Sequence, residues 1–205
     1  MAKRDDWDKR YSARALTWSV GPNALFAQIV GKLPSGKAID VASGEGRNAI
    51  WLAEQGWEVD AIDFSKVGIT KAEQIAAKKN VKVNWIVNDI TSFEFAPGAY
   101  DLVAVLYLHT SLAERERWLP RIIDAVAPGG HFVYIAHDPA NVESGVGGPQ
   151  DSSLLPSVAD LISLLDGFAV QSAEVHGRSV VSDPGHGGSS PGVALDTVIH
   201  AIRIR

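Results

Sequence analysis

The chain has 205 residues, a formal net charge of −5 at pH 7 and no cysteine. This length suits one domain, and the lack of cysteine excludes a thiolate nucleophile, a thiolate zinc site and a disulfide framework. The acidic balance argues against nucleic acid as a partner, and no apolar run approaches the ~20 residues that cross a bilayer. The charged start, MAKRDDWDKRY, lacks the apolar core of a signal peptide. We therefore expect a cytoplasmic protein that binds neither nucleic acid nor membrane, and the sequence predicts no oligomeric state.

Strand patterns alternate with helix patterns along the chain, which predicts an α/β fold with a parallel sheet covered on both faces. The predicted elements are a helix over 22–33, a strand over 37–42, a helix over 46–56, a strand over 57–62, a helix over 65–79, strands over 81–87 and 100–108, a helix over 114–126, a strand over 131–136, a helix over 157–165, and strands over 168–175 and 193–204. The last two strands have a period of two and should pair as an antiparallel edge.

Two connections, 137–156 and 176–192, are long and rich in Gly, Pro and Ser. Loops of this length in a compact domain are usually functional or disordered. The first leaves the carboxyl end of a strand that we expect to be parallel, which is the ligand-binding edge of an open α/β sheet. The second lies near that edge only if the last strand is antiparallel.

The segment AIDVASGEGRNA, residues 38–49, is a buried strand that enters a Gly-x-Gly loop and opens a helix. Glycine lets a ligand approach the backbone closely, and the helix amino terminus offers free N–H groups and a positive dipole end. Asp63, at the end of the second strand, is placed to accept both ribose hydroxyls of an adenosine. Asp89 follows the third strand at the same edge. Together these features predict a nucleoside cofactor.

These positions resemble the cofactor fingerprint of class I S-adenosylmethionine-dependent methyltransferases. The fingerprint is an acid, a glycine-rich loop, a ribose acid and an Asp-Ile or Asp-Leu pair at the adenine, and it is matched by Asp40, Gly44, Gly46, Asp63 and Asp89. The segment DVASGEGRNAIWLAEQGWEVDAIDFS is especially similar to tellurite-resistance and thiopurine-type methyltransferases, which also carry an amino-terminal tryptophan–tyrosine segment like residues 7–11. Ala42 replaces the first glycine of the family's loop, and we expect cofactor binding to survive this small intrusion.

The resemblance implies one Rossmann-like, doubly wound methyltransferase domain over 1–205, with 1–34 as an amino-terminal lid segment and helix. Its seven-stranded, mostly parallel sheet would have the order 3-2-1-4-5-7-6, with the last strand antiparallel. The cofactor would be S-adenosylmethionine and the acceptor a small molecule, such as a soft thiol or chalcogen nucleophile. The implied cofactor-binding residues are Trp7, Arg10, Tyr11, Asp40, Ala42, Ser43, Gly44, Glu45, Gly46, Asp63, Phe64, Asp89, Ile90 and Leu106.

The sequence alone also permits two other functions. Gly44-x-Gly46-x-x-Ala49 also satisfies the dinucleotide motif, so an NAD(P)-dependent oxidoreductase is the alternative, and a non-catalytic nucleoside-binding module is a third. No second domain and no catalytic Tyr/Lys or His/Arg set supports the oxidoreductase. The six histidines lack zinc-binding spacing, so we predict no metal site.

Methyl transfer requires alignment of the acceptor and exclusion of water, and it requires a base only if the acceptor arrives protonated. Residues that leave the fourth and fifth strands are the candidates to line an acceptor pocket. They are Tyr107, His109, His137 and Asp138. We predict His109 as the base, because an unperturbed imidazole titrates near pH ~6.5, with His137 and Asp138 as further catalytic candidates.

Overall fold

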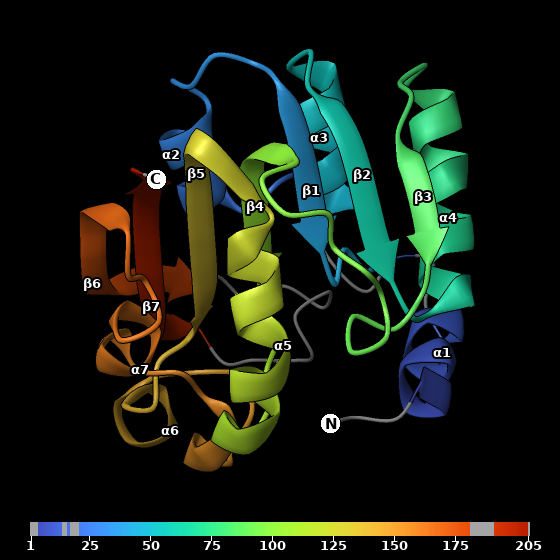
Figure 1. Ribbon diagram of the computed structural model, residues 1–205. Helices are drawn as coiled ribbons and strands as arrows, with labels where there is room; N and C mark the ends of the chain where they lie inside the picture. Colours follow the sequence, from blue (N-terminus) through green and yellow to red (C-terminus); the bar gives the residue numbers. More distant parts are fainter. Residues whose placement is uncertain (1–3, 14–15, 17–20, 181–190, 205) are drawn as a thin grey trace.

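In the computed structural model, the described residues are 4–13, 16, 21–180 and 191–204. The remaining parts of the expected lid segment and of the loop 176–192 lie outside them. Seven strands form one sheet of order β3-β2-β1-β4-β5-β7-β6 (Figure 1). The strands are β1 (Lys37–Val41), β2 (Glu58–Asp63), β3 (Asn84–Val87), β4 (Tyr100–Leu106), β5 (Val126–His137), β6 (Phe168–Val180) and β7 (Gly192–Arg203). Strands β1 to β5 pair in parallel, and β7 is antiparallel to both β5 and β6, which confirms the predicted topology.

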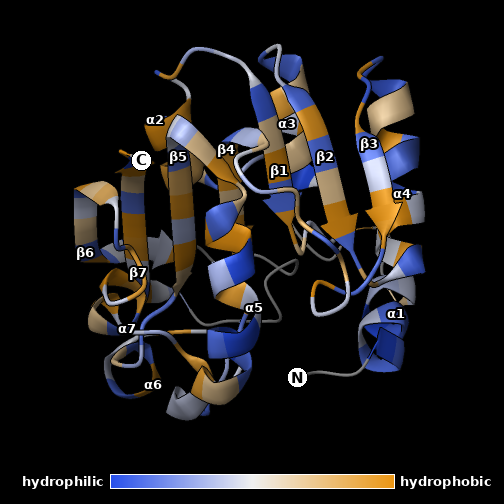
Figure 2. Ribbon diagram, in the orientation of Figure 1, coloured by the Kyte–Doolittle hydropathy of each residue, from blue (hydrophilic) through white to orange (hydrophobic). Residues whose placement is uncertain are grey.

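Helices cover both faces of this sheet and enclose two hydrophobic cores. The helices are α1 (Arg4–Ser12), α2 (Ala24–Val30), α3 (Arg47–Glu54), α4 (Lys66–Lys78), α5 (Leu112–Asp124), α6 (Asn141–Ser144) and α7 (Val158–Ile162), with a short 3-10 helix over Ser152–Leu154. Neighbouring strand residues enter opposite cores: Ile39 belongs to the core with α5 and α7, and Ala38 to the core with α2 and α3. Hydrophobic residues accordingly run along the strands, whereas α1 is mostly hydrophilic (Figure 2).

The structure differs from the sequence prediction in several elements: α6 and the 3-10 helix lie in the predicted loop 137–156, and three other differences are larger. Residues 4–12 form a helix that the polar sequence did not suggest. Strand β5 starts at Val126 instead of 131, with a register shift opposite Tyr100 and Leu102 that accommodates Ala-Pro-Gly-Gly. Strand β6 continues to Val180, because its backbone still pairs with β7 where Gly and Ser suggested a loop.

The parallel strands end at one edge of the sheet, the lower edge in Figure 1, where α1 and α6 lie on opposite sides. Because β7 is antiparallel to β5, it begins at this same edge: its Asp196 pairs with His137 at the end of β5. The turn end of the β6–β7 hairpin therefore lies beside the carboxyl ends of the parallel strands. The long loop 137–156 leaves from the same place.

Candidate active site

A cavity of about 950 Å³ opens at this edge. Its walls come from α1, the residues before α2, the loop after β1, the ends of β2, β4 and β5, the loop 137–156 and the end of β6. The predicted site residues in its lining are Trp7, Arg10, Tyr11, Asp40, Ala42, Ser43, Gly44, Asp63, Phe64, Leu106, His109 and His137. The predicted residues outside the lining are Glu45, Gly46, Asp89, Ile90 and Asp138.

The glycine loop after β1 contains three left-handed residues: Ala42 (φ 58°), Gly44 (φ 57°) and Gly46 (φ 75°). The two glycines have different reasons to be glycine. Gly44 lines the cavity, where a bare backbone can approach a ligand. An added Cβ at Gly46 would lie 2.5 Å from Trp85 Cη2. Gly46 is therefore required by packing against Trp85.

Ala42 adopts a conformation that costs an L-residue about 1–2 kcal/mol. We expect Ala42→Gly to raise the free energy of unfolding by about 0.5–1 kcal/mol, because glycine relieves the Cβ strain but has greater freedom in the unfolded chain. Urea denaturation measures this change. The matched control is Ala53→Gly within α3, which should lose about 1 kcal/mol. A loss at Ala42 as large as that at Ala53 would contradict the strain.

Two buried carboxylates flank the glycine loop. Asp63 accepts hydrogen bonds from the backbone N–H of Gly44 and of Ser65, one on each oxygen, both at 2.8 Å. Burial raises the pKa of Asp63, although these two bonds oppose the shift. Asp40 is 1% exposed and accepts a bond of 3.1 Å from the Ala49 N–H. Burial raises the pKa of Asp40 to about 7. Both carboxylates thus sit beside the cavity with acceptor capacity left for a ligand.

The predicted residues outside the lining have other contacts. Glu45 forms an ion pair of 3.1 Å with Lys71. The Asp89 carboxylate accepts from the backbone N–H and the hydroxyl of Thr91, and so shapes the turn after β3. The Asp138 carboxylate accepts from Thr197 Oγ1 at 2.6 Å and from the Ala140 N–H, and so anchors the loop after β5. These side chains hold the walls of the site in place.

Helix α1 docks onto the amino terminus of α4 beside the glycine loop. The Ser65 hydroxyl donates to Asp8, and the Lys71 ammonium donates to the Tyr11 carbonyl. Gly68 of α4 permits this approach, since a Cβ there would lie 3.0 Å from the Gly44 carbonyl oxygen and 3.2 Å from the Tyr11 ring. The Trp7 and Tyr11 rings lie 5.4 Å apart in the cavity wall. The docking places two aromatic rings next to the loop.

At the opposite side of the cavity lies a polar cluster, which we call the Asp196 cluster: Tyr107, His109, His137, Arg178 and Asp196. The carboxylate of Asp196, which is fully buried, accepts bonds from Arg178 Nε at 2.7 Å and from the Tyr107 hydroxyl at 2.8 Å. His137 Nδ1 lies 3.2 Å from Asp196 Oδ1. Burial alone would raise the pKa of Asp196, but its contacts with His137, Arg178 and Tyr107 outweigh burial and lower it. The cluster therefore keeps an ionised carboxylate under the cavity wall.

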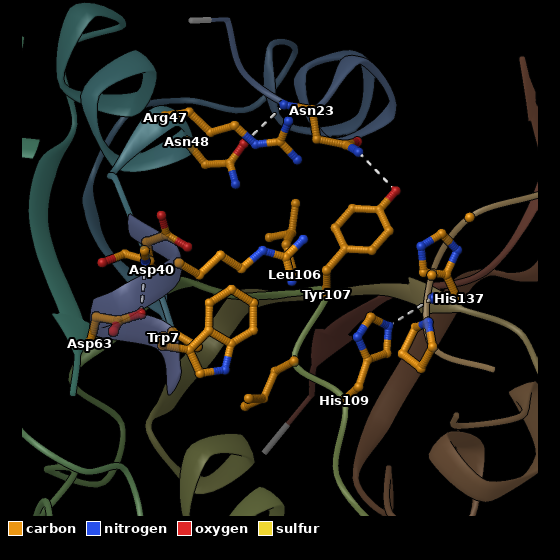
Figure 3. A pocket seen from close by; sticks show the side chains of 18 of the residues that line it. Trp7, Asn23, Asp40, Arg47, Asn48, Asp63, Leu106, Tyr107, His109 and His137 are labelled. Carbon is orange, nitrogen blue, oxygen red and sulfur yellow. Dashed lines mark hydrogen bonds between the residues drawn. The ribbon is translucent and has the colours of Figure 1, made fainter. Parts of the chain in front are cut away.

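His109 stacks on His137, with ring centroids 5.4 Å apart and planes 15° apart. Its Nε2 accepts a bond of 3.3 Å from the His137 backbone N–H. Burial, reinforced by the neighbouring His137, lowers the pKa of His109 to about 3. Figure 3 shows this pair at one end of the cavity, with Asp40 and Asp63 at the other and Trp7 between them. His109 is therefore neutral at physiological pH and a weak proton acceptor.

Sequence reasoning missed Asp196 and Arg178, which come from the closing hairpin. A signal was present for Asp196, because it is the one acid in the apolar strand GVALDTVIHAI. Among the described residues, no group of three or more His, Cys, Asp or Glu side chains could hold a metal ion. Within the same residues, no helix is both long and apolar enough to cross a membrane.

The chain is similar to known methyltransferases in part of its sequence. A family model described as a methyltransferase domain matches residues 38–130, from β1 into β5. The chain is 28% identical over 152 residues to 2-heptyl-1-hydroxyquinolin-4(1H)-one methyltransferase of Mycobacteroides abscessus, covering 71% of this chain and 66% of that protein. It is 28% identical over 109 residues to demethylmenaquinone methyltransferase of Renibacterium salmoninarum, covering 53% of this chain and 44% of that protein. The chain thus spans about two thirds or less of the length of these relatives.

Among solved structures, TehB from Haemophilus influenzae superposes with a TM-score of 0.71 at 17% identity, covering 98% of this chain and 68% of that one. This likeness extends the shared fold beyond the matched domain to nearly the whole chain. This likeness in fold is consistent with the sheet order, with the glycine loop and its two acids, and with the match to the methyltransferase-domain model. The chain is thus similar to a methyltransferase domain over residues 38–130, and nearly its whole length has the fold of the class I S-adenosylmethionine-dependent methyltransferases.

Proposed function

We propose that the protein transfers the methyl group of S-adenosylmethionine to a small-molecule acceptor bound in the cavity at the carboxyl edge of the sheet. The observation that carries the proposal is that one cavity connects the acids at the glycine loop with the Asp196 cluster. The first part suits a nucleoside ligand with a charged tail, and the second suits an acceptor with a polar group. A volume of about 950 Å³ is large enough for both molecules.

The residues around the glycine loop fit this cofactor. Asp40 would face the ammonium of the methionine part, with Ser43 and Gly44 alongside it. Asp63 would accept the ribose hydroxyls, since each of its oxygens has a second lone pair beyond its backbone bond. Phe64 and Leu106 would pack against the cofactor.

Two residues that we predict to contact the adenine lie outside the cavity. Asp89 and Ile90 stay our candidates for the adenine, but neither lines the cavity. Ile90 is buried in the core, and the Asp89 carboxylate bonds Thr91. The segment after β3 would have to shift for its backbone to reach the adenine.

Bound S-adenosylmethionine supplies an electrophilic methyl group on a sulfonium. The chain's contribution is to hold an acceptor in line with that methyl group and to exclude water. Trp7, Arg10 and Tyr11 of α1 would cover the cofactor, and the loop 137–156 contributes Val146, Pro149 and Leu154 to the wall over the acceptor.

A methyl-transfer screen tests the proposal, with release of S-adenosylhomocysteine as the readout. The acceptors are phenols, thiols, amines and oxyanions, each assayed with and without a chelator. We expect turnover of at least one class, unchanged by the chelator. Binding of the cofactor product without turnover of any class would favour a nucleoside-binding module instead.

We expect Trp7→Ala to weaken binding of S-adenosylhomocysteine about five- to tenfold, because the cofactor would lose an aromatic cover worth about 1 kcal/mol. The matched control is Lys9→Ala, because Lys9 is exposed on the same helix and does not line the cavity. Isothermal calorimetry measures both affinities. Equal affinities in the two variants would remove Trp7 from the cofactor site.

A further inference from the structure

We propose that His137 is the general base of the transfer, that Asp196 is the residue that positions it, and that the acceptor group is a hydroxyl on an aromatic or heteroaromatic ring. This inference rests on the proposed function and extends it to a proton transfer and a substrate class. Its evidence is the arrangement of the Asp196 cluster at the cavity wall.

The sheet itself brings the two residues together. His137, the last residue of β5, and Asp196, near the start of β7, are direct partners in the antiparallel register. His137 Nδ1 is buried and lies 3.2 Å from Asp196 Oδ1, within ion-pair distance, and among the described residues it makes no hydrogen bond with any other group. A carboxylate at Nδ1 favours the tautomer with the proton on Nδ1, which leaves Nε2 as the proton acceptor. His137 lines the cavity, and the absence of a side chain at Gly148 keeps its Cδ2–Nε2 edge open, because a Cβ there would lie 2.8 Å from Nε2.

Other side chains besides His137 contact the Asp196 carboxylate and hold it in place. Arg178 Nε and the Tyr107 hydroxyl both donate to Asp196 Oδ2, and Asn23 Nδ2 donates in turn to the Tyr107 oxygen at 3.1 Å. Tyr107 adopts a left-handed backbone conformation (φ 54°), which costs a bulky residue free energy and places its side chain in this network. A buried carboxylate is costly unless it is paired, and here the pairing fixes the orientation of His137.

His109 is the less suitable base on the same geometry. Its Nε2 already accepts the backbone N–H of His137, so taking a substrate proton at this atom would break that bond. Its stacked ring supports one face of the His137 imidazole. Within the described part of the chain, the ionisable groups around His137 are Tyr107 and His109 after β4, Asp196 on β7, Arg178 on β6 and the adjacent Asp138, whose carboxylate bonds Thr197. Gly148 of the loop 137–156 packs against the Cδ2–Nε2 edge of the ring and adds no charge.

The proton and electrons balance in a single displacement. The acceptor O–H gives its proton to His137 Nε2, and the oxygen lone pair forms the new bond to the methyl carbon. The carbon–sulfur bond breaks, and its electron pair stays on sulfur as a neutral thioether. Asp196 stabilises the imidazolium that forms, and the proton then passes to solvent.

A base with a positioning carboxylate points to an acceptor that arrives protonated. A thiol, with a pKa of about 8.5, is a few per cent thiolate at neutral pH and that thiolate is a strong nucleophile, whereas a phenolic hydroxyl, with a pKa of about 10, depends more on a base. The wall beside His137 includes Tyr107, Leu108, Pro149 and Leu154, which suits a flat apolar ring that carries the hydroxyl. This chemistry differs from the soft nucleophile that the sequence resemblance implies.

The first test needs no substrate. Nitrogen NMR of histidine-labelled wild-type protein, assigned with His137→Gln, reports the tautomer of each imidazole. We expect His137 to carry its proton on Nδ1. A proton on Nε2 would overturn the proposal, whether or not an acceptor is known and whether or not any Asp196 variant folds.

The second test uses a phenol that is un-ionised at the assay pH and a nitrophenol that is largely ionised there. His137→Gln should lower kcat for the phenol about 100-fold or more, and far less for the nitrophenol. Asp196→Asn should lower kcat for the phenol about tenfold, and far less for the nitrophenol, because the imidazolium that forms during proton transfer loses its counter-charge. His131→Gln is the control, because His131 is a half-buried histidine six residues earlier on β5 and does not line the cavity.

Equal losses for both phenols, in His137→Gln or in Asp196→Asn, would assign a merely structural role to the pair. Turnover of thiols alone by the wild-type protein would overturn the hydroxyl class. These outcomes differ from failure of the proposed function, in which the wild-type protein would neither bind S-adenosylhomocysteine nor transfer a methyl group to any acceptor.

Discussion

Asp63→Ala should weaken binding of S-adenosylhomocysteine by about 10- to 150-fold. Hydrogen bonds to a charged acceptor are worth about 1.5–3 kcal/mol, and two ribose hydroxyls would lose that acceptor. The substitution also frees the Gly44 and Ser65 N–H groups that Asp63 holds, so the loop would lose order as well. Isothermal calorimetry gives the affinity, and thermal denaturation separates the loss of ligand contacts from the loss of fold.

The control is Asp166→Ala, because Asp166 is exposed and lies outside the cavity. It should leave both affinity and melting temperature unchanged. If Asp63→Ala melts lower than the wild-type protein but binds equally well, then Asp63 serves only the loop.

Asp40→Asn should have opposite effects on stability and on binding at pH 8. In the folded protein the pKa of Asp40 is raised from 3.8 to about 7, so the folded state holds its proton more tightly than the unfolded state. The stability that this proton contributes is complete below pH 4 and is lost as the pH rises through about 7. At pH 8 the wild-type protein buries a carboxylate, and the amide of the variant removes that penalty.

We expect the variant to be more stable than the wild-type protein by about 2–4 kcal/mol at pH 8, and equally stable near pH ~4. Binding of S-adenosylhomocysteine should weaken, because the ammonium of its amino-acid tail loses a counter-charge. Urea denaturation at the two pH values and calorimetry at pH 8 measure the two effects. A stability difference that does not change with pH would contradict the raised pKa, and unchanged binding would remove Asp40 from the ligand site.

Much of the fold could be predicted because its signals are local. Strand and helix periods alternate along the chain, and Ser65 caps α4 as its sequence position suggested. The two period-two strands at the end indicated the antiparallel edge. The misplaced boundaries, at β5 and β6, lie where backbone pairing across the sheet outweighs the local preference of Gly, Pro and Ser for turns.

The candidate site likewise has one part with a local sequence signal and one part that depends on pairing across the sheet. The acids and glycines of the cofactor side lie within one continuous segment and could be read from it. Asp196 and Arg178 could not, because only the register of a hairpin with β5 brings Arg178 to the cavity and Asp196 beneath its wall. Gly46 shows a further limit: the motif predicts a residue that binds the cofactor, whereas Gly46 lies outside the cavity lining and packs against Trp85.

The most direct test of the central claim is a pair of calorimetric titrations of the wild-type protein, one with S-adenosylhomocysteine and one with NAD. We predict one saturable site for S-adenosylhomocysteine and no measurable heat with NAD, because the buried acids at the glycine loop are matched to a ribose and an amino-acid tail. Saturable binding of NAD, with no heat from S-adenosylhomocysteine, would contradict the assignment of this cavity to methyl transfer.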